Sequence, residues 1–456
     1  MNDISRNGAG VPKAQRRSIH PGSGRRKAPL FPKGRVLQQA EVATVQAILG
    51  DDEGKGKRER ALLIEYLHRI QDREGCLPAS HLHALAEILK IPMAEVYEVA
   101  TFYAHFDVVG DGEPRPEPVT VRVCDSLSCM LAGAETLIET LQSDTMPGVR
   151  VVRAPCIGSC HTAPAAEVGH HHVDHATPAK LKELALAGHV HPTIPAYQDF
   201  DAYQKAGGMR MLRACLSGER KVEDVIAALS DGGLRGLGGA GFPTGHKWSL
   251  VRAEKGPRLM AVNGDEGEPG TFKDRIYLEK EPHRFLEGML IAAWAVEAEQ
   301  VFIYMRDEYP AVISILRTEI AKLEAAGLTK HTRVHVRRGA GAYICGEESA
   351  MIESIEGKRG LPRHRPPYVA QVGIFGRPTL VNNIETLHWV PAILEKGAQW
   401  FASQGKNGGK GLRSYSVSGR VKNPGMVLTA AGSTCMELIG LCGGMADGHH
   451  FKGYLP

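Results

Sequence analysis

The sequence predicts an α/β protein of several domains, with a helical segment in front of two α/β regions. Three observations support this fold class. At 456 residues the chain is too long for one hydrophobic core. Near residue 118 the apolar spacing changes from a helical period to alternating strands and helices. From about residue 230 onward, glycine-rich loops punctuate the chain.

The pattern divides the chain into five parts in order. These are a tail (1–35), a helical domain (36–110), a small α/β domain (118–190), a large α/β domain (200–400) and a short β-rich segment (412–456). The elements expected within them are helices over 81–89 (capped by Ser80), 93–105, 132–142, 178–186, 285–296 and 311–325, and strands over 119–123, 149–152, 166–168 and 300–304.

The tail is expected to be disordered, because nine Lys or Arg stand against one acid among many Gly, Pro and Ser. It suits an acidic partner subunit better than nucleic acid, since the remainder of the chain is slightly acidic. No apolar run reaches the length that a membrane helix needs, and because the first residues contain no apolar segment, a secretion signal is not expected. We therefore expect a cytoplasmic protein that does not insert into membranes, and its nine cysteines are not expected to form disulfides.

Two cysteine pairs carry a chemical pattern. Cys124 and Cys129, and then Cys156 and Cys160, each follow a predicted strand, so both pairs lie in loops at one end of the small sheet. Four thiolates there suit an iron–sulfur cluster, and Gly158 leaves room for backbone N–H groups to point at the sulfurs. Zinc is the rival interpretation and disulfides are the structural alternative.

A histidine run, His170–His172 with His175, offers a second metal interpretation. Its place in a polar turn after a strand favours solvated histidines instead.

The large region carries a glycine loop. Gly236-Leu-Gly-Gly-Ala-Gly241 fits the dinucleotide fingerprint formally, but a helix-like segment precedes it where a strand is required. The loop still allows close backbone approach to a flat or anionic ligand, with Lys247 after it and Phe242 as a stacking face.

Two further loops are acidic. Asp265, Glu266 and Glu268 lie among glycines, and Glu347 and Glu348 precede a helix. Such carboxylates accept hydrogen bonds from ribose hydroxyls and repel a 2′-phosphate, which favours NAD over NADP. A solvated acidic turn is the alternative. Further on, 381–386 brings amides and a hydroxyl to a helix start, a place suited to a phosphate or flavin edge.

These motifs resemble known families. The cysteine region, including Ala154-Pro-Cys-Ile-Gly-Ser-Cys160, resembles the thioredoxin-like [2Fe–2S] subunit of respiratory complex I over 36–190. The glycine and acidic loops resemble the NADH-binding flavoprotein subunit of complex I, and its relatives in NAD-reducing hydrogenases and formate dehydrogenases, over 205–456. The resemblance implies a thioredoxin-like domain, a Rossmann-like FMN/NAD domain and an incomplete ubiquitin-like (SLBB-type) segment.

The resemblance also implies site residues. FMN would be held by Gly236, Gly238, Lys247, Asn263, Asp265, Tyr343, Gly346, Glu347, Asn382, Asn383 and Thr386. NAD would contact Phe242, Glu266, Glu268, Glu348, Arg365 and Tyr368. Leu237 departs from the usual arginine of complex I proteins, and Arg365 and Tyr368 replace lysine and phenylalanine.

The implied function is exchange of hydride between NAD(H) and FMN, and of single electrons with iron–sulfur clusters. The fused modules, the basic tail and Leu237 look most like the beta subunit of a formate dehydrogenase, whose partner is a catalytic molybdenum or tungsten iron–sulfur subunit. A complex I or hydrogenase module, and a cluster scaffold without flavin, are the alternatives. The family's [4Fe–4S] cluster is expected, but its ligand cysteines are absent from this chain, and Cys435 and Cys442 are expected to be core residues.

Overall fold

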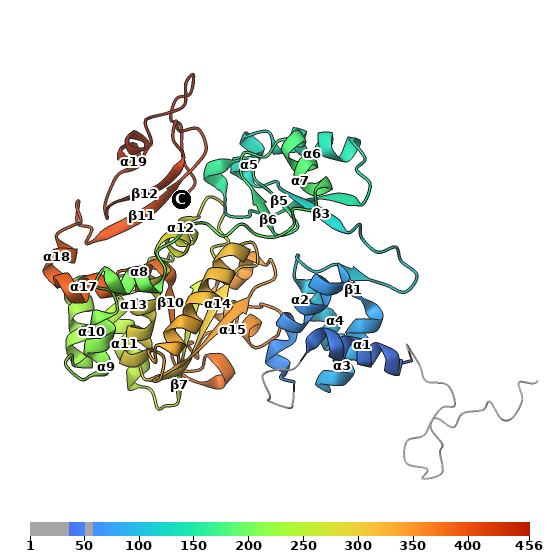
Figure 1. Cartoon of the computed structure of the whole chain (residues 1–456). Coiled ribbons are helices and arrows are strands. Elements are labelled where there is room, and N and C mark those ends of the chain that lie inside the picture. Colours follow the sequence, from blue (N-terminus) through green and yellow to red (C-terminus); the bar gives the residue numbers. More distant parts are fainter. Residues whose placement is uncertain (1–35, 51–57) are drawn as a thin grey trace, which may run out of the picture.

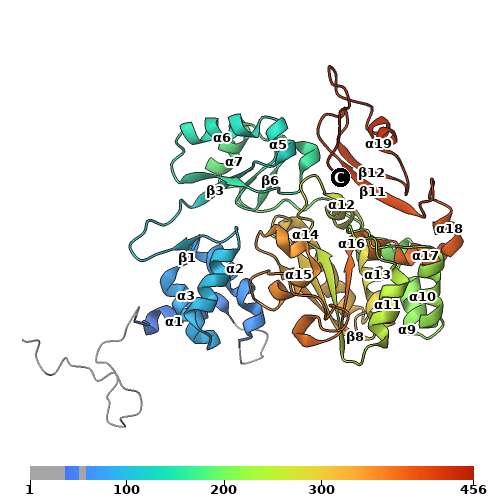
Figure 2. The same cartoon turned by 180° about the vertical axis from the view of Figure 1, so that it is seen from behind.

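The computed structural model describes residues 36–50 and 58–456, so the basic tail lies outside the described residues. The helical domain lies against α15 of the large domain, and the small α/β domain and the C-terminal segment lie near α12 (Figures 1 and 2). None of the helices among the described residues is both long and apolar enough to cross a membrane.

The helical domain contains α1 (Gln39–Leu49), η2 (Arg60–Leu62), α2 (Leu63–Glu74), α3 (Ala79–Leu89), α4 (Met93–Phe102) and the short parallel strands β1 (Leu77–Pro78) and β2 (Val108–Val109). The predicted cap at Ser80 is wrong. Helix α3 begins at Ala79 after Pro78, and the Ser80 hydroxyl lies 3.3 Å from His81 Nδ1. Helix α4 ends three residues earlier than expected.

The small domain has a four-stranded sheet in the order β4-β3-β5-β6. Its elements are β3 (Val119–Cys124), α5 (Leu127–Leu131), α6 (Ala134–Ser143), β4 (Val149–Ala154), η3 (Cys160–Thr162), β5 (Ala166–Val168), β6 (His171–Val173) and α7 (Pro178–Leu186). Strands β3 and β4 are parallel, so the loops that follow them meet at one end of the sheet. This places both cysteine pairs together, as the sequence predicts.

The large domain is built on a parallel sheet in the order β10-β7-β8-β9. Its strands are β7 (Arg258–Gly264), β8 (Ala298–Met305), β9 (Arg333–Arg338) and β10 (Thr379–Asn383). Its helices are α8 (Phe200–Lys205), α9 (Arg210–Leu216), α10 (Val222–Asp231), α11 (Thr244–Ala253), α12 (Lys273–Lys280), α13 (Pro282–Ala295), α14 (Pro310–Ala325), η4 (Tyr343–Gly346), α15 (Glu348–Ile355), η5 (Ile374–Gly376), α16 (Ile384–His388), α17 (Val390–Lys396) and α18 (Ala398–Ala402). The predicted strand and the two long helices are confirmed to within three residues.

The two faces of this sheet belong to different cores. Met260 and Val262 face α13 and α14, whereas Leu259 and Ala261 face α15 and the N-terminal helices. Strands buried on both faces read as continuous apolar runs, as Leu259–Val262 does. The helical domain therefore shares its core with the large domain, which the sequence does not reveal.

The C-terminal segment pairs β11 (Leu412–Val417) with β12 (Gly425–Ala430) in an antiparallel hairpin, against which α19 (Cys435–Leu441) packs. Cys442 is buried in the small core there and Cys435 packs against it, so the expectation of core cysteines is confirmed.

Candidate functional site

The four cysteines gather between the small domain and the large one. All four are buried and none forms a disulfide. The sulfurs of Cys156 and Cys160 are 3.4 Å apart, and Cys124 lies within hydrogen-bonding reach of Cys129 and Cys156. Hydrogen bonds from Cys124 and Cys160 lower the pKa of Cys156 despite its burial, whereas the bonds to neighbouring cysteines raise the pKa of Cys124 and Cys160. Cys156 is therefore favoured to be a thiolate, and it is the convergence of the four sulfurs that fits shared ligation.

Backbone N–H groups point at these sulfurs. Ala165 N lies 3.4 Å from Cys129 Sγ, and Gly270 N lies 3.2 Å from Cys160 Sγ. N–H donors stabilise anionic sulfur, so converging thiols with such donors fit an iron–sulfur cluster. Gly158 adopts φ +75°, and a Cβ there would lie 2.2 Å from Tyr309 Oη, so this loop position requires glycine.

The contact from Gly270 joins the cysteine loops to the large domain. Arg306, directly after β8, donates to the carbonyl oxygens of Cys156 and Glu266. Arg275 donates to Gly158 O at 3.3 Å. Neither arginine was predicted from the sequence. The sequence feature that could have identified Arg306 is its position directly after a buried strand. Functional residues of parallel sheets commonly lie at this carboxyl edge.

The glycine loop lies beside the start of α16. Leu237 N donates to Thr386 Oγ1 at 2.9 Å, and a Cβ on Gly238 would lie 3.0 Å from the Cβ of Asn383. Lys247 Nζ donates to Val381 O at 3.0 Å and lies 3.5 Å from Glu348. The structure thus brings two of the predicted FMN segments together. The side chain of Asn382 is buried and accepts from Trp248 Nε1 at 2.9 Å.

The two acidic loops also meet. Asn263 Nδ2 donates to Gly346 O at 2.8 Å, and the Tyr343 hydroxyl donates to Glu268. Asp265 Oδ2 is buried without a partner among the described residues, and burial raises the pKa of Asp265 to about 7.

Asp265 lines a cavity of about 310 Å³ that also touches Cys156, Gly267 and Tyr343. An orphaned acceptor at the carboxyl edge of a parallel sheet fits a ligand that supplies a hydroxyl or amide donor, as FMN does.

The residues assigned to NAD differ in how exposed they are. Phe242 and Tyr368 expose 42% and 56% of their surface. The Phe242 ring stacks on His246 with centroids 5.7 Å apart, so its other face and the Tyr368 ring are available for stacking. Arg365 pairs with Glu347 and lies 3.2 Å from Glu348. Glu266, by contrast, is buried.

The Glu266 carboxylate points into the protein, with 7% of the residue exposed. It accepts from Asp274 N at 2.9 Å, from Arg275 N at 3.3 Å and from the Tyr309 hydroxyl at 3.1 Å. These bonds cap the start of α12, so the geometry gives Glu266 a structural role, and its contact with NAD stays a prediction.

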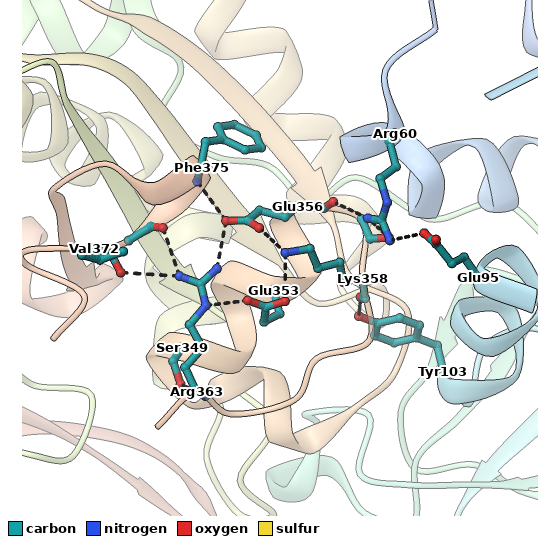
Figure 3. A network of polar contacts seen from close by, with 12 residues as sticks. Arg60, Glu95, Tyr103, Ser349, Glu353, Glu356, Lys358, Arg363, Val372 and Phe375 are labelled. Atoms are coloured by element: carbon teal, nitrogen blue, oxygen red, sulfur yellow. Dashed lines mark hydrogen bonds and ion pairs between the residues drawn. The ribbon is translucent and has the colours of Figure 1, made fainter. Parts of the chain in front are cut away.

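The segment that carries Arg365 and Tyr368 is held by the network in Figure 3. The Arg363 guanidinium bonds Glu356 at 2.9 Å and Gly373 O at 3.0 Å, and it also bonds Glu353. From the helical domain, the Tyr103 hydroxyl donates to Lys358 O at 2.7 Å and Arg60 donates to Glu356 O at 3.0 Å. The N-terminal helices thus support the segment that is predicted to contact NAD, and the sequence does not indicate this support.

The histidine run does not converge on one point. His170 faces Asp72 at 3.6 Å, His171 Nδ1 lies 3.1 Å from His191 O, and His172 faces Asp174 at 3.3 Å. Part of the run lies in strand β6 and not in a turn.

The four buried cysteines contact loops at the carboxyl edge of the parallel sheet of the large domain. This arrangement is the one expected of a protein that holds a flavin next to an iron–sulfur cluster. Family models match at three places: the Nuo51 FMN-binding domain at 229–392, the thioredoxin-like [2Fe–2S] ferredoxin at 46–187 and the SLBB domain at 414–453. The chain belongs to the family of NADH-binding flavoproteins, in a form fused to a thioredoxin-like [2Fe–2S] domain. These matches confirm the cofactors expected from the sequence. FMN and a [2Fe–2S] cluster are the cofactors of the matched domains, and NAD(H) is that of the relatives.

Individual relatives agree. The chain is 41% identical to the F 2 subunit of the NADH-quinone oxidoreductase of Rhizobium meliloti, over 58% of this chain and 65% of that protein. It is 44% identical to the F subunit of the same enzyme in Aquifex aeolicus, over 54% and 59%. The chain thus spans less than two thirds of the length of these curated relatives. A crystal structure of NAD+-reducing [NiFe]-hydrogenase in the air-oxidized state aligns with TM-score 0.73 and 31% identity, covering 84% of this chain and 70% of that one.

Proposed function

We propose that the chain exchanges electrons between NAD(H) and iron–sulfur centres, with FMN bound at the glycine loop. Bound FMN would supply the conversion between the hydride of NAD(H) and the single electrons of a cluster. One observation carries the proposal: Gly270 N lies 3.2 Å from Cys160 Sγ. The loop that holds the acidic site residues is therefore in direct contact with a cluster ligand, which keeps the transfer distance short.

The chain's own residues bind and orient the ligands. The buried Asp265 oxygen would accept a hydrogen bond from the flavin, and Gly236 and Gly238 let the backbone approach it. Glu268 and Glu348 would accept from ribose hydroxyls and repel a 2′-phosphate, so NAD is favoured over NADP. Phe242 and Tyr368 offer exposed aromatic faces to the bases.

Anaerobic NADH titration of the purified chain, with its cofactors loaded, tests the proposal. Flavin bleaching followed by the electron paramagnetic resonance (EPR) signal of a reduced [2Fe–2S] cluster is the expected result. Flavin bands that do not respond to NADH would refute it. Cluster absorption without any flavin would identify an iron–sulfur scaffold.

Within this function we propose that the partner is a formate-oxidising molybdenum- or tungsten-dependent iron–sulfur subunit. The fusion of both modules, the basic tail and Leu237 support this partner. The match to an NAD+-reducing hydrogenase over 84% of the chain favours a hydrogenase as the second candidate. Isolating the complex and comparing formate with hydrogen as the donor for NAD+ reduction separates the two. A complex that accepts neither donor and passes NADH electrons to a quinone would instead be of the complex I type.

A further inference from the structure

A cluster of histidines and carboxylates lies where the helical, small and large domains meet, and the proposed electron transfer does not use it. His68 and Asp72 are four residues apart on α2, so they share one helix face. His105 follows α4. One ligand atom from each of these three side chains lies within 4.8 Å of the other two.

Both histidines are oriented by acceptors. His68 Nε2 lies 2.8 Å from Gly339 O, and His105 Nδ1 lies 2.7 Å from Asp307 Oδ2. A carbonyl or carboxylate oxygen can only accept, so each ring donates from that nitrogen and keeps a lone pair on the other. Metal-binding histidines are typically fixed in this way by a carbonyl or carboxylate behind the ring.

The lone pair of His68 has no partner among the described residues. His68 is 2% exposed, and its Nδ1 is buried and unbonded. Burying an acceptor without a hydrogen bond is unfavourable. An occupant that accepts electron pairs would remove this penalty.

The charges that contact the cluster are compatible with a bound cation. Arg338 lies 2.7 Å from Asp72 Oδ2 and also donates to Asp307, so one guanidinium faces two carboxylates. A protonated His170 could supply the positive charge in place of a metal ion, because its Nε2 lies 3.6 Å from Asp72 Oδ1. Its ring stacks on that of His105, with the two ring centroids 6.1 Å apart. If His170 is protonated, the group is an ion-pair network that needs no metal.

We propose that His68, Asp72 and His105 bind one zinc ion. Two imidazoles with one carboxylate suit zinc better than magnesium or calcium, which prefer oxygen ligands. The fourth tetrahedral position is left to water or to His170. All three ligands come from the helical domain, and the hydrogen bonds from His68 to Gly339 O and from His105 to Asp307 cross to the large domain, so a bound ion would fix the two rings that make these cross-domain bonds.

The test uses the full chain with its flavin and cluster, freed of loose metal by a mild chelator and then given zinc. Zinc, iron and sulfide are counted per chain, and zinc X-ray absorption gives the ligand shell. His68→Gln keeps a donor for Gly339 O but removes the ring nitrogen ligand. His331→Gln is the matched control, because His331 Nε2 also faces a backbone carbonyl, Leu290 O at 3.1 Å, and its Nδ1 is also buried and unbonded.

One zinc per chain with only nitrogen and oxygen neighbours, at about 2.0–2.1 Å, is expected. His68→Gln should weaken zinc binding at least tenfold, and His331→Gln should not. Asp307→Asn, which leaves all three ligands, should weaken it about 10- to 100-fold. A sulfur shell at about 2.3 Å would place the zinc on the cluster cysteines and overturn the proposal. Failure of the loaded chain to retain zinc would also overturn it, leaving an ion-pair network.

Discussion

Replacing Glu266 by Gln separates its two possible roles. As a helix cap, Glu266 receives two backbone N–H groups and the Tyr309 hydroxyl. Gln retains one acceptor oxygen but turns an NH2 group toward donors, so at least one buried donor loses its partner. Leaving a buried donor unsatisfied costs about 1–3 kcal/mol, which makes opening of the first turn of α12 about 5- to 150-fold more frequent.

Hydrogen exchange at the amides of Asp274 and Arg275 measures this opening, and steady-state kinetics measures NADH binding. We expect faster exchange in Glu266→Gln, with a KM for NADH within about threefold of the wild type. Glu268→Gln is the reciprocal variant, because the Glu268 carboxylate accepts from the exposed Tyr343 hydroxyl instead of the amides at the start of α12. It should raise KM and leave exchange unchanged. A tenfold rise in KM for Glu266→Gln without faster exchange would refute the capping role.

The Glu266 carboxyl group also makes the stability of the closed loop depend on pH. Burial, followed by the charge of Asp274, raises the pKa of Glu266 to about 7. In the opened loop the ordinary pKa is about 4.3, so between these values the closed loop binds a proton that the open loop lacks. The stability of the closed loop therefore falls as pH rises through this window, by up to about 1.4 kcal/mol per pH unit. Glu266→Gln should reduce this slope to the part that comes from Asp265, whose pKa burial also raises to about 7. An unchanged slope would contradict the assignment.

Two further predictions concern the packing of α13 on α16 and the polar network around Arg363. Gly288→Ala places a Cβ 1.9 Å from Leu387 O, so α13 and α16 must separate; we expect weaker FMN retention and a loss of about 1–3 kcal/mol in unfolding free energy. Gly440→Ala, whose Cβ meets nothing within 4 Å, is the control in chemical denaturation, and equal losses in both would contradict the packing. Arg363→Met frees the 361–373 segment from Glu356, so KM for NADH should rise with unchanged iron content. Unaltered KM would show that this network does not position the segment.

The sequence alone determined the chemistry and the local structure. Cys124 and Cys156 end or follow parallel strands, and β10 passes into α16 at Asn383, because apolar alternation and glycine punctuation are local signals. The types of residue in each loop were enough to indicate thiolate ligands and an acidic nucleotide loop.

Tertiary structure decided which side chains face the cavity and which turn away from it. Asp265, Glu266 and Glu268 are near neighbours in sequence, yet Asp265 lines the cavity whereas Glu266 turns toward the start of α12 and Tyr309, which offer it donors. The contact between Gly270 and Cys160 spans 110 positions. The burial of Leu259 and Ala261 against the N-terminal helices likewise joins distant segments. The residue types and their spacing along the chain determine which chemistry a loop can support. Burial and hydrogen-bond partners, however, are supplied by distant segments that only folding brings together.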